Sequence, residues 1–222
     1  MHCKKHLQWF DMVPLASWVA LRGKCRYCGA KISIQYPLVE AATGIIFALI
    51  GGAGLPLLVI PFALAAAALL VCIFVYDLYH TIIPDVWVWP FCILAFAFSL
   101  FSTNYQLPTT NYLLAGPAAA SILFALWLVS RGAWMGFGDV KLALGMGWLL
   151  GFPAGIVAVF FGFVLGAATT VPLLMWGKLR AGSHGGLTMK SEVPFGPFLI
   201  ASTCIIWFAL LYNIPIPIFS QI

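Results

Sequence analysis

The feature that most constrains this chain is the recurrence of long apolar runs separated by very few charges. Charged residues make up 8% of the 222 residues and apolar residues 63%, whereas a soluble domain carries roughly a quarter charged residues. The chain cannot solvate its own surface, so lipid has to be part of its solvent. Runs of about 20 apolar residues, long enough to span a bilayer as an α-helix, follow one another along the sequence. The sequence therefore predicts an all-α polytopic membrane protein.

Seven apolar segments fit this prediction, and short Gly- and Pro-containing turns such as GGAGLP and GFP join some of them. They cover residues 38–53, 57–77, 86–102, 111–130, 139–150, 154–176 and 195–213. The segment at 139–150 is short for a full span. We therefore expect it to be tilted or packed inside the helix bundle.

The charged residues gather in four clusters, which alternate with uncharged turns. The clusters precede the first segment and follow the second, fourth and sixth, so they all lie on one side of a membrane that the segments cross in alternation. The positive-inside rule makes that side cytoplasmic. We therefore expect residues 1–37 to form a cytoplasmic cysteine-containing segment, residues 38–222 to form a membrane-embedded helix bundle, and the C-terminus to lie outside. The net charge of +5 then reflects orientation, and no nucleic-acid partner is expected.

Two of the six acidic residues lie where a predicted membrane segment meets the cytoplasm: Asp77 in VYDLYH and Asp139 in GFGDVK. An ionisable group near hydrocarbon is costly, which makes it a candidate functional group. Two carboxylates at close range do not both ionise, so one holds a proton while the other activates a water, as in aspartic proteases. The alternative, in which Asp139 caps a helix and Asp77 is a solvated loop acid, stays open. Sequence spacing alone does not show that the two acids meet.

The residues around Asp139 suggest how its surroundings are built. Gly136 and Gly138 give the backbone access to conformations closed to other residues, and leave space for another backbone beside Asp139. Asp139 also opens a predicted helix, where the helix dipole favours its ionised form. Lys141 is two residues further on and does not share the helix face of Asp139. We interpret it as an orientation charge or a substrate-region group.

Four sequence blocks occur in an order that matches a known family. They are PLASWVALRGKCRYCGAKISIQYPLVEAATG, YDLYHTIIPD, GFGDVKLALGMGWLLG and VPFGPFLIAS. Together they resemble the bacterial type IV prepilin peptidases, a family of membrane aspartic proteases. The resemblance implies a GxGD-type intramembrane aspartic protease architecture, with Asp77 and Asp139 as the catalytic pair and Gly136 and Gly138 in the active-site loop. Asp85 matches a commonly acidic position that we do not assign to catalysis.

The resemblance implies an activity that needs no cofactor. The chain would remove the basic leader peptide of type IV prepilins and pseudopilins after a glycine, at the cytoplasmic face of the bacterial inner membrane. Presenilin-type proteases also pair Y-D with G-x-G-D, but the cysteine region and PFGPFL argue against that family. The alternative from a different class is a small transporter that uses Asp77 and Asp139 for proton or cation coupling.

A second activity is also implied by the resemblance. Many family members methylate the new N-terminal residue with S-adenosylmethionine, and Gly23 and Lys24 match methylation-linked positions. Glu40, at the start of the first apolar segment, is a further candidate for this role. Family members usually carry one more membrane helix before the cysteine region. We therefore expect a truncation, natural or engineered, which affects methylation more than proteolysis because both aspartate blocks are intact.

Three cysteines, Cys3, Cys25 and Cys28, lie outside the apolar segments. The family has two C-x-x-C pairs, and this chain has one pair and a single cysteine of the other. Stable disulfides are not expected in the cytoplasm. Thiolates at this spacing bind zinc tetrahedrally, with the fourth position open to a group such as His6. A zinc site and three reduced thiols without a metal are both open.

Overall fold

The computed structural model describes residues 6, 8–101, 109–180 and 194–215. In these ranges the chain forms one short 3-10 helix and eight α-helices, and its β-pairing is limited to an isolated bridge between Lys24 and Lys31. The all-α fold class predicted from the sequence is thereby confirmed. The chain divides into two compact units, residues 1–52 and residues 53–222.

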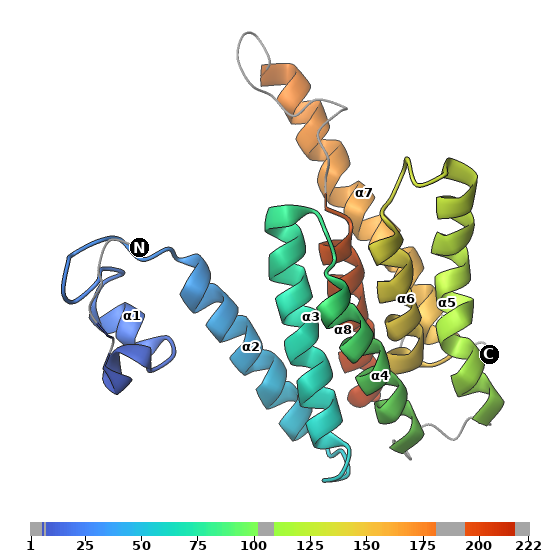
Figure 1. The fold of residues 1–222 in the computed structure, drawn as a ribbon, viewed down its shortest axis with the longest axis horizontal. Helices are drawn as coiled ribbons and strands as arrows, with labels where there is room; N and C mark the ends of the chain where they lie inside the picture. The colour runs from blue at the N-terminus through green and yellow to red at the C-terminus, as the bar shows by residue number, and fades with distance from the viewer. Residues whose placement is uncertain (1–5, 7, 102–108, 181–193, 216–222) are drawn as a thin grey trace. The chain divides into compact units, whose positions relative to one another are not determined.

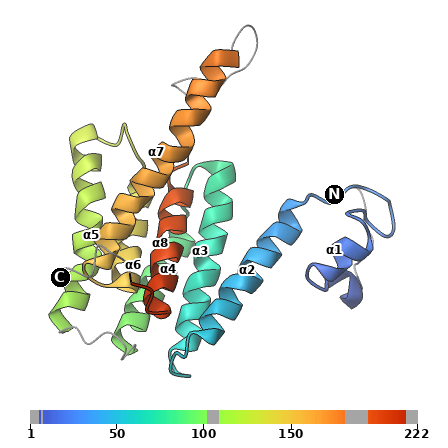
Figure 2. The same cartoon turned by 180° about the vertical axis from the view of Figure 1, so that it is seen from behind.

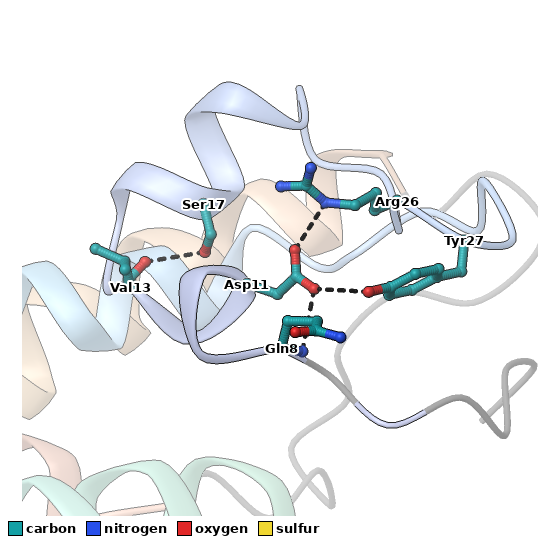
Figure 3. A network of polar contacts seen from close by, with 6 residues as sticks. All are labelled: Gln8, Asp11, Val13, Ser17, Arg26 and Tyr27. Carbon is teal, nitrogen blue, oxygen red and sulfur yellow. Dashed lines mark hydrogen bonds and ion pairs between the residues drawn. The ribbon is translucent and has the colours of Figure 1, made fainter.

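The first unit combines a compact N-terminal segment with one long helix. The segment contains η1 (Trp9–Met12) and α1 (Ala16–Ala20), and the helix is α2 (Gln35–Gly52). The carboxylate of Asp11, whose side chain is 3% exposed, accepts hydrogen bonds from Arg26 Nε at 2.8 Å and from Tyr27 Oη and Gln8 N at 3.3 Å each (Figure 3). These contacts hold η1 against the turn that contains Cys25 and Cys28.

The second unit is a bundle of six helices (Figures 1 and 2). They are α3 (Ile60–His80), α4 (Asp85–Phe101), α5 (Thr109–Ser130), α6 (Phe137–Leu150), α7 (Ala154–Arg180) and α8 (Gly196–Leu211). Helix α6 packs against α4, α5, α7 and α8, and nine of its 14 residues are buried. The short segment predicted at 139–150 is therefore packed inside the bundle, as its length suggested.

Small residues let α6 lie deep in the bundle. A Cβ on Gly147 would come within 2.3 Å of the carbonyl oxygen of Ala115, so only glycine allows α5 and α6 to approach this closely. Buried apolar side chains fill the rest of the interior. Among them, Phe98 of α4 and Trp207 of α8 meet edge to face, with ring centroids 5.7 Å apart.

Long apolar helices make this a multi-pass membrane protein. Within the described ranges, four stretches of helix are long and apolar enough to cross a bilayer: Gln35–Gly52, Ile60–His80, Leu113–Ser130 and Ala154–Pro172. Helices α4 and α8 are apolar but shorter. Large apolar side chains are also exposed on the outer faces of the bundle, where lipid would cover them: Ile93, Val129, Phe160 and Ile205.

Candidate functional site

Asp77 lies in the last turn of α3, in a buried position. The residue is 3% exposed, and its Oδ2 atom has no hydrogen-bond partner among the described residues. The helix ends three residues later, and Thr81 caps it in the left-handed conformation by donating its N–H to the carbonyl oxygen of Asp77 at 2.8 Å. A buried carboxylate oxygen without a partner is costly. Such an atom is expected where a function requires it.

Asp139 lies in the first turn of α6 and is 8% exposed. The N-cap of this helix is Gly136, and Asp139 N donates a hydrogen bond to Gly136 O at 3.3 Å. Asp139 therefore belongs to the first turn of α6, and it borders the cavity beside this turn.

The two carboxylates line one cavity of about 1010 Å³ in the second unit. The other walls come from the loop after α3, the loop before α6, and the facing parts of α7 and α8. Gly136 belongs to the second of these loops and Gly138 to the first turn of α6, so four sequence-predicted site residues surround one space. The alternative in which Asp77 is a solvated loop acid is wrong, because Asp77 is buried inside a helix.

Gly136 and Gly138 differ in how much space a side chain would have at each position. Neither has a positive φ angle, so the prediction that they adopt conformations closed to other residues is wrong. A Cβ on Gly138 would lie 2.9 Å from Ile83 Cβ, whereas a Cβ on Gly136 would lie 3.9 Å from Gly138 N and 4.0 Å from Asp139 Oδ2. Gly138 is therefore required for space, and the group that approaches it is a side chain, Ile83, rather than another backbone.

Gly196 is a residue of the site to which the sequence analysis assigned no role. It begins α8, and a Cβ at this position would lie 2.5 Å from Asp77 Oδ2. The sequence signal was the position of this glycine in PFGPFL, between Pro194 and Pro197. The role of Gly196 depends on its close contact with Asp77, which is far away in the sequence.

A separate cavity of about 350 Å³ lies within the first unit. Trp18, Tyr36 and Glu40 are among the residues that line it. Glu40 Oε2 accepts a hydrogen bond from Leu15 N at 2.8 Å. Gly23 has a φ angle of +69°, and a Cβ on it would lie 3.0 Å from the Trp18 ring. Glu40 thus lines the cavity, whereas Gly23 lies against the ring of Trp18, one of its walls.

Lys24 and the cysteines occupy other positions in the first unit. Lys24 forms the bridge with Lys31 and does not line the cavity. Cys25 and Cys28 share one tight turn, in which Cys25 N donates to Ala30 O at 2.8 Å. Cys3 lies outside the described residues. Within the described part of the chain, no group of three or more His, Cys, Asp or Glu residues is placed to hold a metal ion.

The fold and the site define a class of protein: a helical membrane protein with two carboxylates in one cavity of its bundle. Two family models match the chain, "Bacterial Peptidase A24 N-terminal domain" over residues 1–52 and "Type IV leader peptidase family" over residues 63–171. The second range contains Asp77 and Asp139. The chain belongs to the type IV leader peptidase family, as the sequence blocks indicated.

Curated relatives support this membership over most of the chain. The prepilin leader peptidase/N-methyltransferase of Dickeya chrysanthemi is 30% identical over 90% of this chain and 69% of its own length. The protein of the same name from Stutzerimonas stutzeri is 30% identical over 96% of this chain and 70% of its own length. The Bacillus subtilis relative is 28% identical over 90% and 77%. No solved structure matches the chain significantly.

Proposed function

We propose that this chain is a membrane aspartic endopeptidase that removes the basic leader peptide of type IV prepilins and pseudopilins after a glycine. The observation that carries the proposal is the shared cavity of Asp77 and Asp139, which come from separate helices. The names of the relatives, prepilin leader peptidase/N-methyltransferase, support the choice of substrate. Membership of a peptidase family favours this function over the alternative of a transporter.

In the proposed mechanism one carboxyl group of the pair is protonated and the other is ionised, because two carboxylates at short range do not both ionise. The ionised carboxylate takes a proton from a water, whose oxygen attacks the scissile carbonyl carbon. The protonated carboxyl group donates a hydrogen bond to the carbonyl oxygen. Collapse of the tetrahedral intermediate breaks the C–N bond and delivers a proton to the leaving amine. The protonation state belongs to the pair, not to either residue.

The cavity walls suit a peptide with apolar side chains. Phe163 of α7 and Phe198 of α8 line the cavity, and Phe195 lies at the start of α8. Apolar walls bind apolar side chains, and a few polar groups orient the ligand. The substrate's own apolar N-terminal helix would lie in the bilayer and bring the leader junction to the two carboxylates. The positive-inside rule assigns this end of the bundle to the cytoplasmic face.

We propose that α2 to α8 all cross the inner membrane and leave the C-terminus outside. Helices α2, α3, α5 and α7 contain stretches that meet the length and hydropathy of a span. Helices α4 and α8 are apolar and have 17 and 16 residues. Helices of this length would cross the bilayer with little tilt, or where it is thinner. Helix α6 is shielded from lipid by its neighbours, so its 14 residues need not match the bilayer thickness.

A second proposed activity is methylation of the new N-terminal residue, located in the cavity of the first unit. S-adenosylmethionine, when bound, would supply the methyl group from its sulfonium. The residues present fit such a ligand: the Trp18 and Tyr36 rings offer a surface for its adenine, and Glu40 offers a carboxylate for its positive charge. Gly23 leaves room for the Trp18 ring. Lys24 does not line this cavity, and it would act from its bridge with Lys31.

A zinc ion held by Cys3, Cys25 and Cys28 is a further proposal for the first unit. Cys25 and Cys28 lie in the same turn, and two thiols at this spacing would supply half of a tetrahedral ligand set. Such a metal would serve folding of the segment and would take no part in proteolysis. Metal analysis of the purified protein, with Cys28→Ser as the comparison, tests it.

One experiment tests both activities. The chain is co-expressed with a matched prepilin, and intact-mass spectrometry of the pilin reads leader removal and methyl addition in the same spectrum. Leader loss that requires the chain supports the peptidase. A prepilin that keeps its leader, although the chain is present in the membrane, contradicts it.

A further inference from the structure

An ion pair joins the two segments that carry the candidate catalytic acids. Lys141 Nζ lies 2.5 Å from Asp85 Oδ1, and the side chains are 17% and 63% exposed, respectively. Lys141 follows Asp139 by two residues on α6, and Asp85 begins α4 directly after the loop that follows α3. The pair thus connects the helix start that carries Asp139 with the chain that leaves Asp77.

Aromatic rings surround the Lys141 ammonium group on the same side. Nζ lies 5.4 Å from the centroid of the Phe137 ring and 5.9 Å from that of Trp89. Both distances are within the range of cation–π contacts. These contacts direct the lysine toward α4. They also explain why it does not share the cavity with Asp139, in agreement with its two-residue spacing.

Two further contacts hold the same pair of segments together. Ile83 packs against Gly138, where a Cβ would come within 2.9 Å. Cys92 Sγ donates to the carbonyl oxygen of Lys141 at 3.4 Å. The first turns of α6 are therefore fastened to residues 83–92 by packing, by a hydrogen bond and by a charge pair, and the charge pair is the most exposed of the three.

We propose that Lys141 and Asp85 are positioning residues, whose ion pair holds Asp139 in the geometry that it needs relative to Asp77. This inference rests on the proposed peptidase function. A partly exposed ion pair adds little to overall stability. Its loss is expected to let the start of α6 move within a fold that stays intact, and a small displacement of one carboxylate lowers the rate of a reaction that both must perform.

The test is a double-mutant cycle on leader cleavage by the full chain, with kcat and KM measured separately on a matched prepilin. Lys141→Ala and Asp85→Ala are each expected to lower kcat about two- to five-fold, the range that an ion pair of this exposure allows. KM is expected to stay unchanged. The double alanine variant should be no slower than the slower single variant, because both remove the same contact.

Two rescue variants complete the test. Lys141→Arg keeps the charge, and the exchange of both charges in Lys141→Asp with Asp85→Lys restores the pair in reverse; both are expected to recover much of the lost kcat. Losses that multiply in the double variant, a rise in KM without a fall in kcat, or a fall in kcat that follows a lower unfolding temperature would each overturn the inference. Wild-type chain that leaves the prepilin intact overturns the proposed function, and the role in proteolysis with it. Wild-type chain that cleaves, with Lys141→Ala cleaving equally well, overturns this inference alone.

Discussion

Gly196 lies so close to Asp77 that a Cβ on the glycine would be 2.5 Å from the carboxylate Oδ2 atom. The start of α8 therefore forms one wall of the Asp77 site. A buried acid at the end of α3 is held by an element from the other end of the chain. Any side chain at position 196 has to displace either the carboxylate or the helix.

Gly196→Ala is expected to reduce leader cleavage strongly while the protein still folds. Overpacking of this kind costs about 1–3 kcal/mol, which corresponds to a loss of roughly ten- to a hundred-fold if it appears in the reaction barrier. The measurement is the rate of prepilin cleavage by purified protein. Gly44→Ala is the matched control. Apart from the backbone of its own helix and its chain neighbours, no described atom lies within 4 Å of a Cβ on Gly44. Equal rates for the two variants would contradict the close approach.

The two glycines of the GFGD loop are expected to differ in their tolerance of alanine. Gly138→Ala should slow cleavage about tenfold, because the new Cβ would lie 2.9 Å from Ile83 Cβ. Gly136→Ala should retain more activity, since its φ of −73° suits alanine and the nearest contacts are 3.9 and 4.0 Å away. Side-by-side cleavage rates decide the point. A greater loss for Gly136→Ala would show that backbone freedom, and not space, is what the loop needs.

Glu40→Gln is expected to lower methylation and to leave leader removal intact. Glutamine keeps an oxygen that can accept the Leu15 N–H, but it removes the negative charge proposed to face the methyl donor. A hydrogen bond or contact to a charged group is worth about 1.5–3 kcal/mol, so methylation should fall roughly ten- to a hundred-fold. Mass spectrometry of the processed pilin measures both activities at once. A parallel loss of cleavage would indicate that the first unit serves proteolysis too.

The helical class followed from the sequence because lipid permits few alternatives. A chain with so little charge can satisfy its backbone in a bilayer only by helices or a closed barrel, and runs of about 20 apolar residues favour helices. The burial of α6 was also predictable, because a segment too short to span has to be shielded by others. The number of helices that cross the whole bilayer was harder to predict, because α4 and α8 are apolar but short.

The details of the site depended on contacts that spacing does not encode. That Asp77 and Asp139 line one cavity follows from how α3 and α6 each pack against α4 and α8, and neither block of sequence contains that information. The loop glycines were predicted for their backbone freedom, whereas Gly138 serves to admit Ile83. Gly196 had no assigned role, because its partner, Asp77, is reached only through the fold. The partner of Lys141 was missed for the same reason.

Amide variants of Asp77 and Asp139 show whether the two acids act as one catalytic pair. Asp77→Asn and Asp139→Asn preserve size and remove the ability to exchange a proton, so purified protein should lose cleavage of a matched prepilin by on the order of a thousandfold or more, as when one member of a catalytic unit is removed. Asp85→Asn, the third acid of this region, should keep at least about a fifth of the activity. Full processing by either Asp77→Asn or Asp139→Asn would contradict the account.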